Sequence, residues 1–91
     1  MNQDLIIIGA GNVGAFLAYN LGLFEGSYNL LGFLDDDQAK VGSTLAGLKV
    51  LGPVGSIAQF PAGTAVAVGV AAPIARKAIM EKIGHYPLAF P

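Results

Sequence analysis

The feature that most constrains the fold of this 91-residue chain is an apolar run followed at once by three spaced glycines. The run, 5–8, reads Leu-Ile-Ile-Ile and is typical of a parallel strand buried on both faces. The sequence Gly9-Ala10-Gly11-Asn12-Val13-Gly14 comes next, and beyond it apolar residues recur with helical spacing at 13, 16, 17, 21 and 24. This order predicts a strand, a tight loop and a helix.

The glycine spacing Gly-x-Gly-x-x-Gly is that of dinucleotide-binding loops, and each glycine has a physical role. Gly9 permits the tight turn, Gly11 lets the backbone approach a phosphate, and Gly14 lets the helix pack on the strand. The unpaired amides at the start of the helix carry partial positive charge that suits a diphosphate. We therefore expect Gly9, Ala10, Gly11, Asn12, Val13 and Gly14 to bind a nucleotide. The alternative is a tight turn that binds nothing.

A second apolar strand, 30–34, ends in the acidic run Asp35-Asp36-Asp37. Strand, helix and strand within about thirty residues form a βαβ unit, whose crossover is almost always right-handed. In Rossmann domains an acidic residue at this strand end accepts hydrogen bonds from a ribose. We expect Asp35 and Asp36 to contact the ligand and Asp37 to be solvated, the alternative being a polar start to a loop.

The remainder of the chain predicts further elements of the same α/β pattern. Gly69 and Val70 end a third buried strand, 64–70, and would line the other side of the ligand crevice beyond the carboxyl ends of the strands. We also expect an edge strand at 50–51, a brief helix at 56–59 capped by Ser56, a helix at 73–83 with its apolar stripe at 74, 75, 78, 79 and 83, and a last strand near 88–90. Residues 1–91 thus predict a single, small, Rossmann-like three-layer α/β domain with a mostly parallel sheet.

Composition excludes several function classes. The net charge of −1 without a basic patch argues against nucleic acid as a partner. Stretch 5–24 is uncharged and long enough to span a membrane, but glycines interrupt it and no positive segment precedes it, so we expect neither a membrane span nor a signal peptide. A cytoplasmic location is the resulting expectation.

Candidates for catalysis are few. The chain has no cysteine and a single histidine, His85, which follows a helix end, and it shows no nucleophile arrangement. We expect no catalytic residue and no metal site. Only 12% of the residues are charged, against about 25% in an average domain, so part of the surface is expected to face a partner or a missing part of a larger protein.

Several short motifs follow one another in a characteristic order along the chain. They are Leu-Ile-Ile-Ile-Gly-Ala-Gly from residue 5, Leu-Gly-Phe-Leu-Asp-Asp-Asp from 31, Gly-Leu-Lys-Val-Leu-Gly from 47, Ala-Val-Gly-Val from 67, Arg-Lys-Ala-Ile-Met-Glu-Lys-Ile from 76 and Tyr-Pro-Leu-Ala-Phe-Pro from 86. In this order they resemble the N-terminal domain of the sugar O- and N-acyltransferases of the PglD/NeuD type. In that family a small Rossmann-like domain precedes a left-handed β-helix.

The resemblance implies a nucleotide-sugar-binding domain. The glycine loop, 9–14, would face the diphosphate or sugar of a UDP-linked sugar, and Asp35 and Asp36 would face the uridine. Acetyl-CoA and the catalytic histidine belong to the β-helix domain, which these 91 residues lack, so no cofactor is expected here. The resemblance also implies a homo-oligomer, a trimer formed mainly through the absent domain. The chain departs from the family in two places: Gly11-Asn12-Val13 stands where the family commonly has Gly-Gly-His or Ser-Gly-His, and apolar residues follow Gly69.

Two other functions remain open at this point. The intact glycine loop and Asp35 also fit an NAD(P)-binding module for redox chemistry or sensing, in which the carboxylate would favour NAD. Low charge and an apolar third strand also fit a structural or oligomerisation domain without ligand. A second family, the cytoplasmic nucleotide-binding domains of polysaccharide-biosynthesis epimerases and glycosyl-phosphate transferases, shares the Gly-Phe-Leu-Asp-Asp-Asp stretch from 32.

Overall fold

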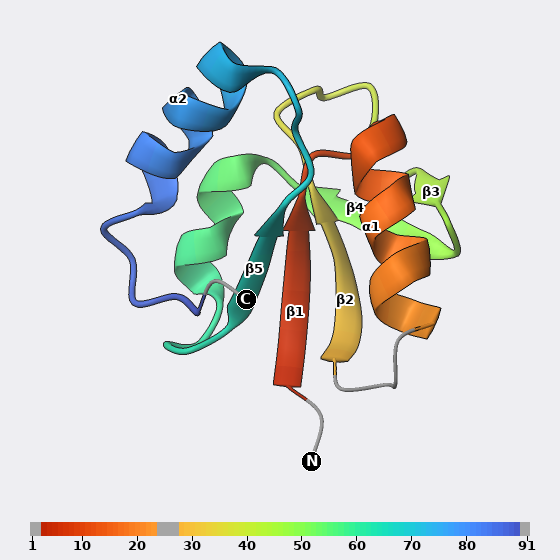
Figure 1. Cartoon of the computed structure of the whole chain (residues 1–91), viewed down its shortest axis with the longest axis horizontal. Coiled ribbons are helices and arrows are strands. Elements are labelled where there is room, and N and C mark those ends of the chain that lie inside the picture. Colours follow the sequence, from red (N-terminus) through yellow and green to blue (C-terminus); the bar gives the residue numbers. More distant parts are fainter. Residues whose placement is uncertain (1–2, 24–27, 90–91) are drawn as a thin grey trace.

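Helical segments separate the first strand from the second and the fourth from the fifth, as expected for a parallel α/β domain (Figure 1). A computed structural model describes residues 3–23 and 28–89. The elements are β1 (Gln3–Ile8), α1 (Asn12–Leu23), β2 (Tyr28–Leu34), β3 (Thr44–Leu45), β4 (Leu48–Gly52), the 3₁₀-helix η1 (Val54–Gln59), β5 (Ala65–Val68) and α2 (Pro73–Ile83). The expected three-layer α/β fold is confirmed.

The sheet has five strands in the order β3-β4-β2-β1-β5. β4, β2, β1 and β5 are parallel, and only β3 runs antiparallel, to β4. The chain therefore runs outward from β1 through β2 to β4 and then returns to β5 on the other side of β1. This reversal places a topological switch point beside β1, where ligands bind in open α/β sheets.

Two predicted edge features differ from the structure. The strand expected at 50–51 is longer, and it is preceded by β3 in a hairpin whose turn residues, Ala46 and Gly47, have φ of 51° and 79°. Both central residues thus lie in the left-handed region that a two-residue hairpin turn requires. The last strand is reduced among the described residues to one bridge between Ala89 and Ala65, and Phe90 lies outside them.

β1 is buried on both faces, as its composition predicts. Leu5, Ile6, Ile7 and Ile8 are all 0% exposed. Leu5 and Ile7 point into the core beneath α1, whereas Ile6 and Ile8 point into the core shared with η1 and α2. Since fully burying such a side chain contributes about 1.5–3 kcal/mol, this strand anchors both layers.

The face that α1 buries is only in part the one that apolar spacing indicates, since Leu17 and Leu21 do pack against the core. Val13 and Phe16 were expected on the buried stripe but are 39% and 66% exposed, while Gly14 and Ala18 face the sheet. The reason is close approach: a Cβ on Gly14 would lie 2.0 Å from the Gly9 carbonyl oxygen. The helix sits so near the strand ends that small residues must occupy the contact.

A similar correction applies to α2. Ile74 is 87% exposed, and Ala75 and Ala78 are also exposed, although all three belong to the predicted stripe. Burial is confined to the second half, where Ile79 and Ile83 pack into the core with η1. η1 and α2 cover the same face of the sheet and contact each other, and the core contacts of α2 come from its second half.

η1 begins earlier than predicted and is not capped by Ser56. It starts at Val54 after Pro53 and has no side-chain cap from its own segment. Instead, the Val54 amide donates a hydrogen bond of 2.9 Å to Asp36 Oδ1, at the end of β2. Lys82 Nζ, from α2, lies 3.2 Å from the other oxygen of that carboxylate. Asp36 therefore ties β2 to both elements of the second layer.

We predict that the glycines of the loop differ sharply in their importance for stability. Gly14→Ala should lower the unfolding free energy by about 3 kcal/mol, because its Cβ would overlap the Gly9 carbonyl, 2.0 Å away. Gly11→Ala should change it by less than about 1 kcal/mol, since a Cβ there meets nothing within 4 Å. Urea unfolding of both variants checks this, and equal midpoints would contradict the packing argument.

We also predict an acid-sensitive contribution from Asp36. The Val54 amide and Lys82 lower the pKa of this carboxyl below its ordinary value of 3.8, so its stabilisation is present at neutral pH and is lost as the pH falls through the lowered pKa. Asp36→Asn should therefore cost less than about 1 kcal/mol at pH 7, because the group is 57% exposed. The cost should shrink as the pH falls from 7 through 3.8 and toward the lowered pKa.

The measurement is urea unfolding of wild type and Asp36→Asn across this pH range. Glu81→Gln is the control, because Glu81 is exposed and makes no hydrogen bond or ion pair within the described part of the chain. A deficit of Asp36→Asn that stays constant with pH would refute the assignment.

Candidate functional site

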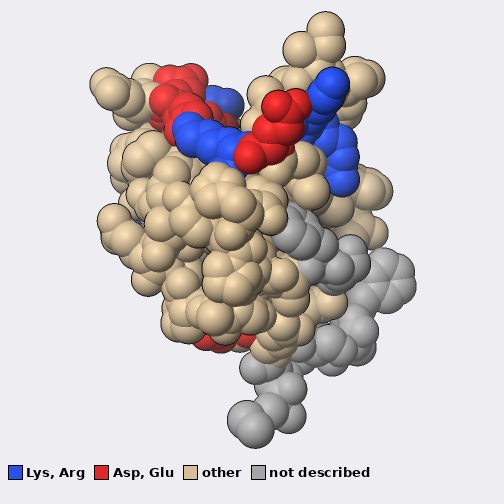
Figure 2. Space-filling model, turned by 90° about the vertical axis from the view of Figure 1, so that its left-hand side faces the viewer, with Lys and Arg blue, Asp and Glu red and all other residues tan. Residues whose placement is uncertain are grey.

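Charged side chains gather at one end of the molecule. Figure 2 shows acidic and basic groups along the upper rim, and the surface below them is almost free of charge. The carboxyl ends of the parallel strands lie at this same end (Figure 1). The sheet topology thus concentrates polar chemistry where a ligand of an open α/β sheet binds.

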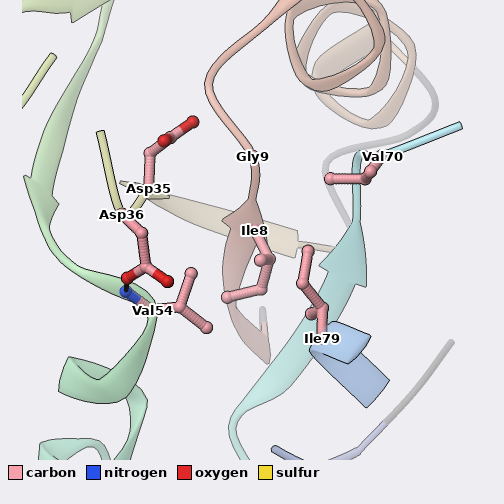
Figure 3. Close-up of a pocket in the computed structure, with 7 residues that line it drawn as sticks. All are labelled: Ile8, Gly9, Asp35, Asp36, Val54, Val70 and Ile79. Atoms are coloured by element: carbon pink, nitrogen blue, oxygen red, sulfur yellow. Dashed lines mark hydrogen bonds between the residues drawn. The ribbon is translucent and has the colours of Figure 1, made fainter. Parts of the chain in front are cut away.

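A cavity of about 150 Å³ opens at this end, on the η1 and α2 side of the sheet. Its walls combine four aliphatic side chains with two carboxylates and one glycine backbone (Figure 3). The lining residues are Ile8, Gly9, Asp35, Asp36, Val54, Val70 and Ile79. Apolar walls with a few placed polar groups are the usual composition of a small-molecule site.

Asp35 lies at the cavity and also holds the glycine loop. Its Oδ2 accepts a hydrogen bond of 2.8 Å from the Ala10 amide, and its Oδ1 accepts one of 2.8 Å from the Asp37 amide. Each carboxylate oxygen has a second lone pair, so contact with a ribose remains compatible with this geometry. Its role toward a ligand stays a prediction.

Asp36 presents a carboxylate that is ionised at neutral pH. The amide of Val54 is the main cause of its lowered pKa; burial opposes the shift and Lys82 adds to it. The side chain is 57% exposed, so it can accept further hydrogen bonds at the cavity mouth. Figure 3 shows Asp35 and Asp36 on the same side of the cavity, opposite Val70.

Three glycines meet where β1, β5 and α1 come together. Gly9 has φ of 99°, and a Cβ on it would lie 2.8 Å from the Gly69 oxygen. A Cβ on Gly69 would lie 2.7 Å from Gly14 Cα. The predicted structural roles of Gly9 and Gly14 are therefore confirmed, and Gly69 belongs to the same contact. Val70, the next residue, lines the cavity.

Gly11 differs from these three because its surroundings are open. It is exposed, and no heavy atom lies within 4 Å of the position its Cβ would take. It immediately precedes α1, and its carbonyl accepts the first helical hydrogen bond, 2.9 Å from the Ala15 amide. Packing therefore gives no reason for a glycine at this position.

The predicted site residues thus fall into two groups. Gly9, Asp35, Asp36 and Val70 line the cavity. Gly11, Asn12 and Val13 are exposed at the start of α1, outside that lining, and the amides of the first helical turn lack intrahelical partners. Ala10, Gly14 and Gly69 are buried between the two groups.

Sequence reasoning missed several residues of this region. Val54 and Ile79 complete the cavity walls; Lys82, one turn beyond Ile79, reaches Asp36. Lys40 reaches the Ala10 carbonyl, and Arg76 donates a hydrogen bond of 2.8 Å to the last carbonyl of β5, on Val68. The helical spacing of 79 and 82 was available in the sequence, whereas Lys40 lies in an irregular segment without any pattern.

No helix in the ranges 3–23 and 28–89 is long and apolar enough to cross a membrane. Within these ranges, no group of three or more His, Cys, Asp or Glu side chains is arranged to hold a metal ion.

Comparison with curated proteins relates one segment of the chain to a regulator. Over 47 residues it is 40% identical to the redox-sensing transcriptional repressor Rex of Thermosipho africanus. The match covers 52% of this chain and 23% of the repressor. The chain thus spans about a quarter of that relative's length.

Two solved structures and one family model match the chain over most of its length. UDP-D-quinovosamine 4-dehydrogenase from Vibrio fischeri superposes with a TM-score of 0.77 at 23% identity, covering 99% of this chain and 76% of that one, which shows a common fold. The acetyltransferase domain of PglB from Neisseria gonorrhoeae, solved with acetyl coenzyme A, has a TM-score of 0.69 and 31% identity over 92% of this chain and 40% of its own. The model of the PglD N-terminal domain matches residues 4–83, and the chain belongs to that family.

Proposed function

We propose that this domain binds a UDP-linked sugar as the nucleotide-sugar-binding part of a sugar acyltransferase. The diphosphate would lie over Gly11 and the first amides of α1, and the uridine would enter the cavity beside Asp35 and Asp36. Family membership and the likeness to the PglB acetyltransferase domain support this proposal. Acetyl-CoA would act in a β-helix domain outside these 91 residues, where the homo-oligomer would also form.

The observation that carries the proposal is the open position of Gly11. The other three glycines of this region are required by contacts under 3 Å, whereas Gly11 has an empty Cβ position directly before a helix N-terminus. A missing side chain there lets an anion reach backbone amides that have no intrahelical acceptor. Two carboxylates in the neighbouring cavity supply acceptors for hydroxyl and imide N–H groups.

NAD binding is the second candidate, and the similarity to the repressor Rex favours it. The matched relative is redox-sensing by name, and the glycine loop with Asp35 suits an adenosine ribose as well as a uridine. A third candidate is a ligand-free assembly domain, motivated by exposed Phe16 and Tyr19 on α1.

We predict that UDP and UDP-N-acetylglucosamine stabilise the domain in a thermal-shift titration, whereas NAD and acetyl-CoA do not. A ligand at one hundred times its Kd stabilises a fold by about 2.7 kcal/mol, which moves the Tm of a domain this small by roughly 10 °C or more. A shift with NAD alone would favour the redox module. No shift with any of these ligands would favour the assembly domain.

We further predict that Gly11→Ala weakens UDP binding at least tenfold without a matching loss of stability. A methyl group at this open position would stand where the phosphate must approach. Titration calorimetry with UDP measures the change, and Gly55→Ala is the matched control because its Cβ position is also empty but lies in η1. Unchanged affinity in Gly11→Ala would remove the main support for the site.

A further inference from the structure

Both backbone polar groups of Ala10 are held by side chains from the segment after β2. The Ala10 amide donates to Asp35 Oδ2 at 2.8 Å, and the Ala10 carbonyl accepts from Lys40 Nζ at 3.2 Å. Lys40 Nζ also lies 4.0 Å from that same Asp35 oxygen. Asp35 and Lys40 therefore hold the backbone in the middle of the glycine loop.

Because the peptide group is planar, these contacts also fix the direction in which the Gly11 N–H points. The Ala10 carbonyl and the Gly11 amide belong to one trans peptide, so the carbonyl oxygen and the N–H point in opposite directions. Lys40 holds the carbonyl on one side, and the Gly11 N–H is consequently directed to the other side. Asp35 sets the preceding plane in the same way, with the Gly9 carbonyl directed at Gly14.

Lys40 is itself well placed to exert this effect. Its backbone amide donates to the Asp37 carbonyl at 2.9 Å, and the Ser43 hydroxyl donates to the Lys40 carbonyl. The side chain is 41% exposed, so its charge is partly desolvated beside the buried Ala10. A charged donor on a carbonyl also polarises the peptide and strengthens its N–H as a donor.

We propose that Lys40 is a positioning residue of the ligand site: by holding the Ala10 carbonyl, it directs and polarises the Gly11 amide toward the phosphate of the ligand. The effect on ligand affinity rests on the proposed function, whereas the effect on the orientation of the Ala10–Gly11 peptide does not. Lys40 acts through the backbone and does not itself contact the ligand. Its main consequence is expected at the phosphate end, because Lys40 does not line the cavity and touches it only through Asp35, 4.0 Å away.

The test compares Lys40→Met, Lys40→Arg and the control Lys49→Met, which removes an exposed lysine on β4. In the ligand-free protein, the ¹⁵N–¹H signal of Gly11 should shift or broaden in Lys40→Met and stay in place in Lys49→Met. Affinity for UDP should fall roughly tenfold in Lys40→Met, the scale of one charge-assisted hydrogen bond. Affinity for uridine, which has no phosphate, should stay within about twofold, and Lys40→Arg should recover most of the loss.

An unchanged Gly11 signal in Lys40→Met would overturn the proposal, as would equal losses of UDP and uridine affinity. Absence of UDP binding by the wild-type protein would count against the proposed function instead. The ligand-free spectra would still decide whether Lys40 sets the loop, so the two failures are distinguishable. Thermal unfolding of each variant checks that the fold is retained.

Discussion

The contact among Gly9, Gly14 and Gly69 is the constraint on which the rest of this structure depends. It brings the end of β1, the end of β5 and the start of α1 so close that any Cβ at these positions would lie within 3 Å of backbone. Because α1 is drawn onto the strand ends, Gly14 and Ala18 face the sheet and the bulky Phe16 turns to solvent. The same proximity brings the glycine loop beside the cavity at the switch point of the sheet.

Charged side chains at the carboxyl ends of the strands form hydrogen bonds with backbone groups that helices and strands leave unpaired. Asp35 and Lys40 satisfy the two polar groups of Ala10, Asp36 caps η1 through Val54, and Arg76 occupies the last carbonyl of β5. Each of these side chains is hydrogen-bonded to the backbone of a segment other than its own. The few charged side chains are thus concentrated where they hold loops in fixed conformations, and under the proposed function they would preorganise the site.

Local patterns in the sequence predict the parts of this fold that depend on local physics. The run 5–8, the glycine loop and the acidic strand end are each formed by residues adjacent in the chain, so each can be interpreted without knowledge of distant contacts. The buried faces of α1 and α2 were predicted only in part: Leu17, Leu21, Ile79 and Ile83 do pack into the core. The rest was wrong because periodicity counts apolar residues and cannot tell which of them a close glycine contact excludes. Ser56 was an incorrect cap for a related reason: the cap, Asp36, comes from 18 residues away. Lys40 carried no signal, since its role arises only when two loops meet.

The arrangement also explains how one loop can belong to proteins with different ligands. The contact of three glycines is required by the fold whatever is bound, so its presence alone cannot distinguish a nucleotide-sugar domain from a redox sensor. Discrimination must come from groups that the packing does not require: the open Gly11 and the side of the cavity formed by Asp36. In this chain the first leaves room for an anion to approach the amides at the start of α1, and the second offers an ionised acceptor.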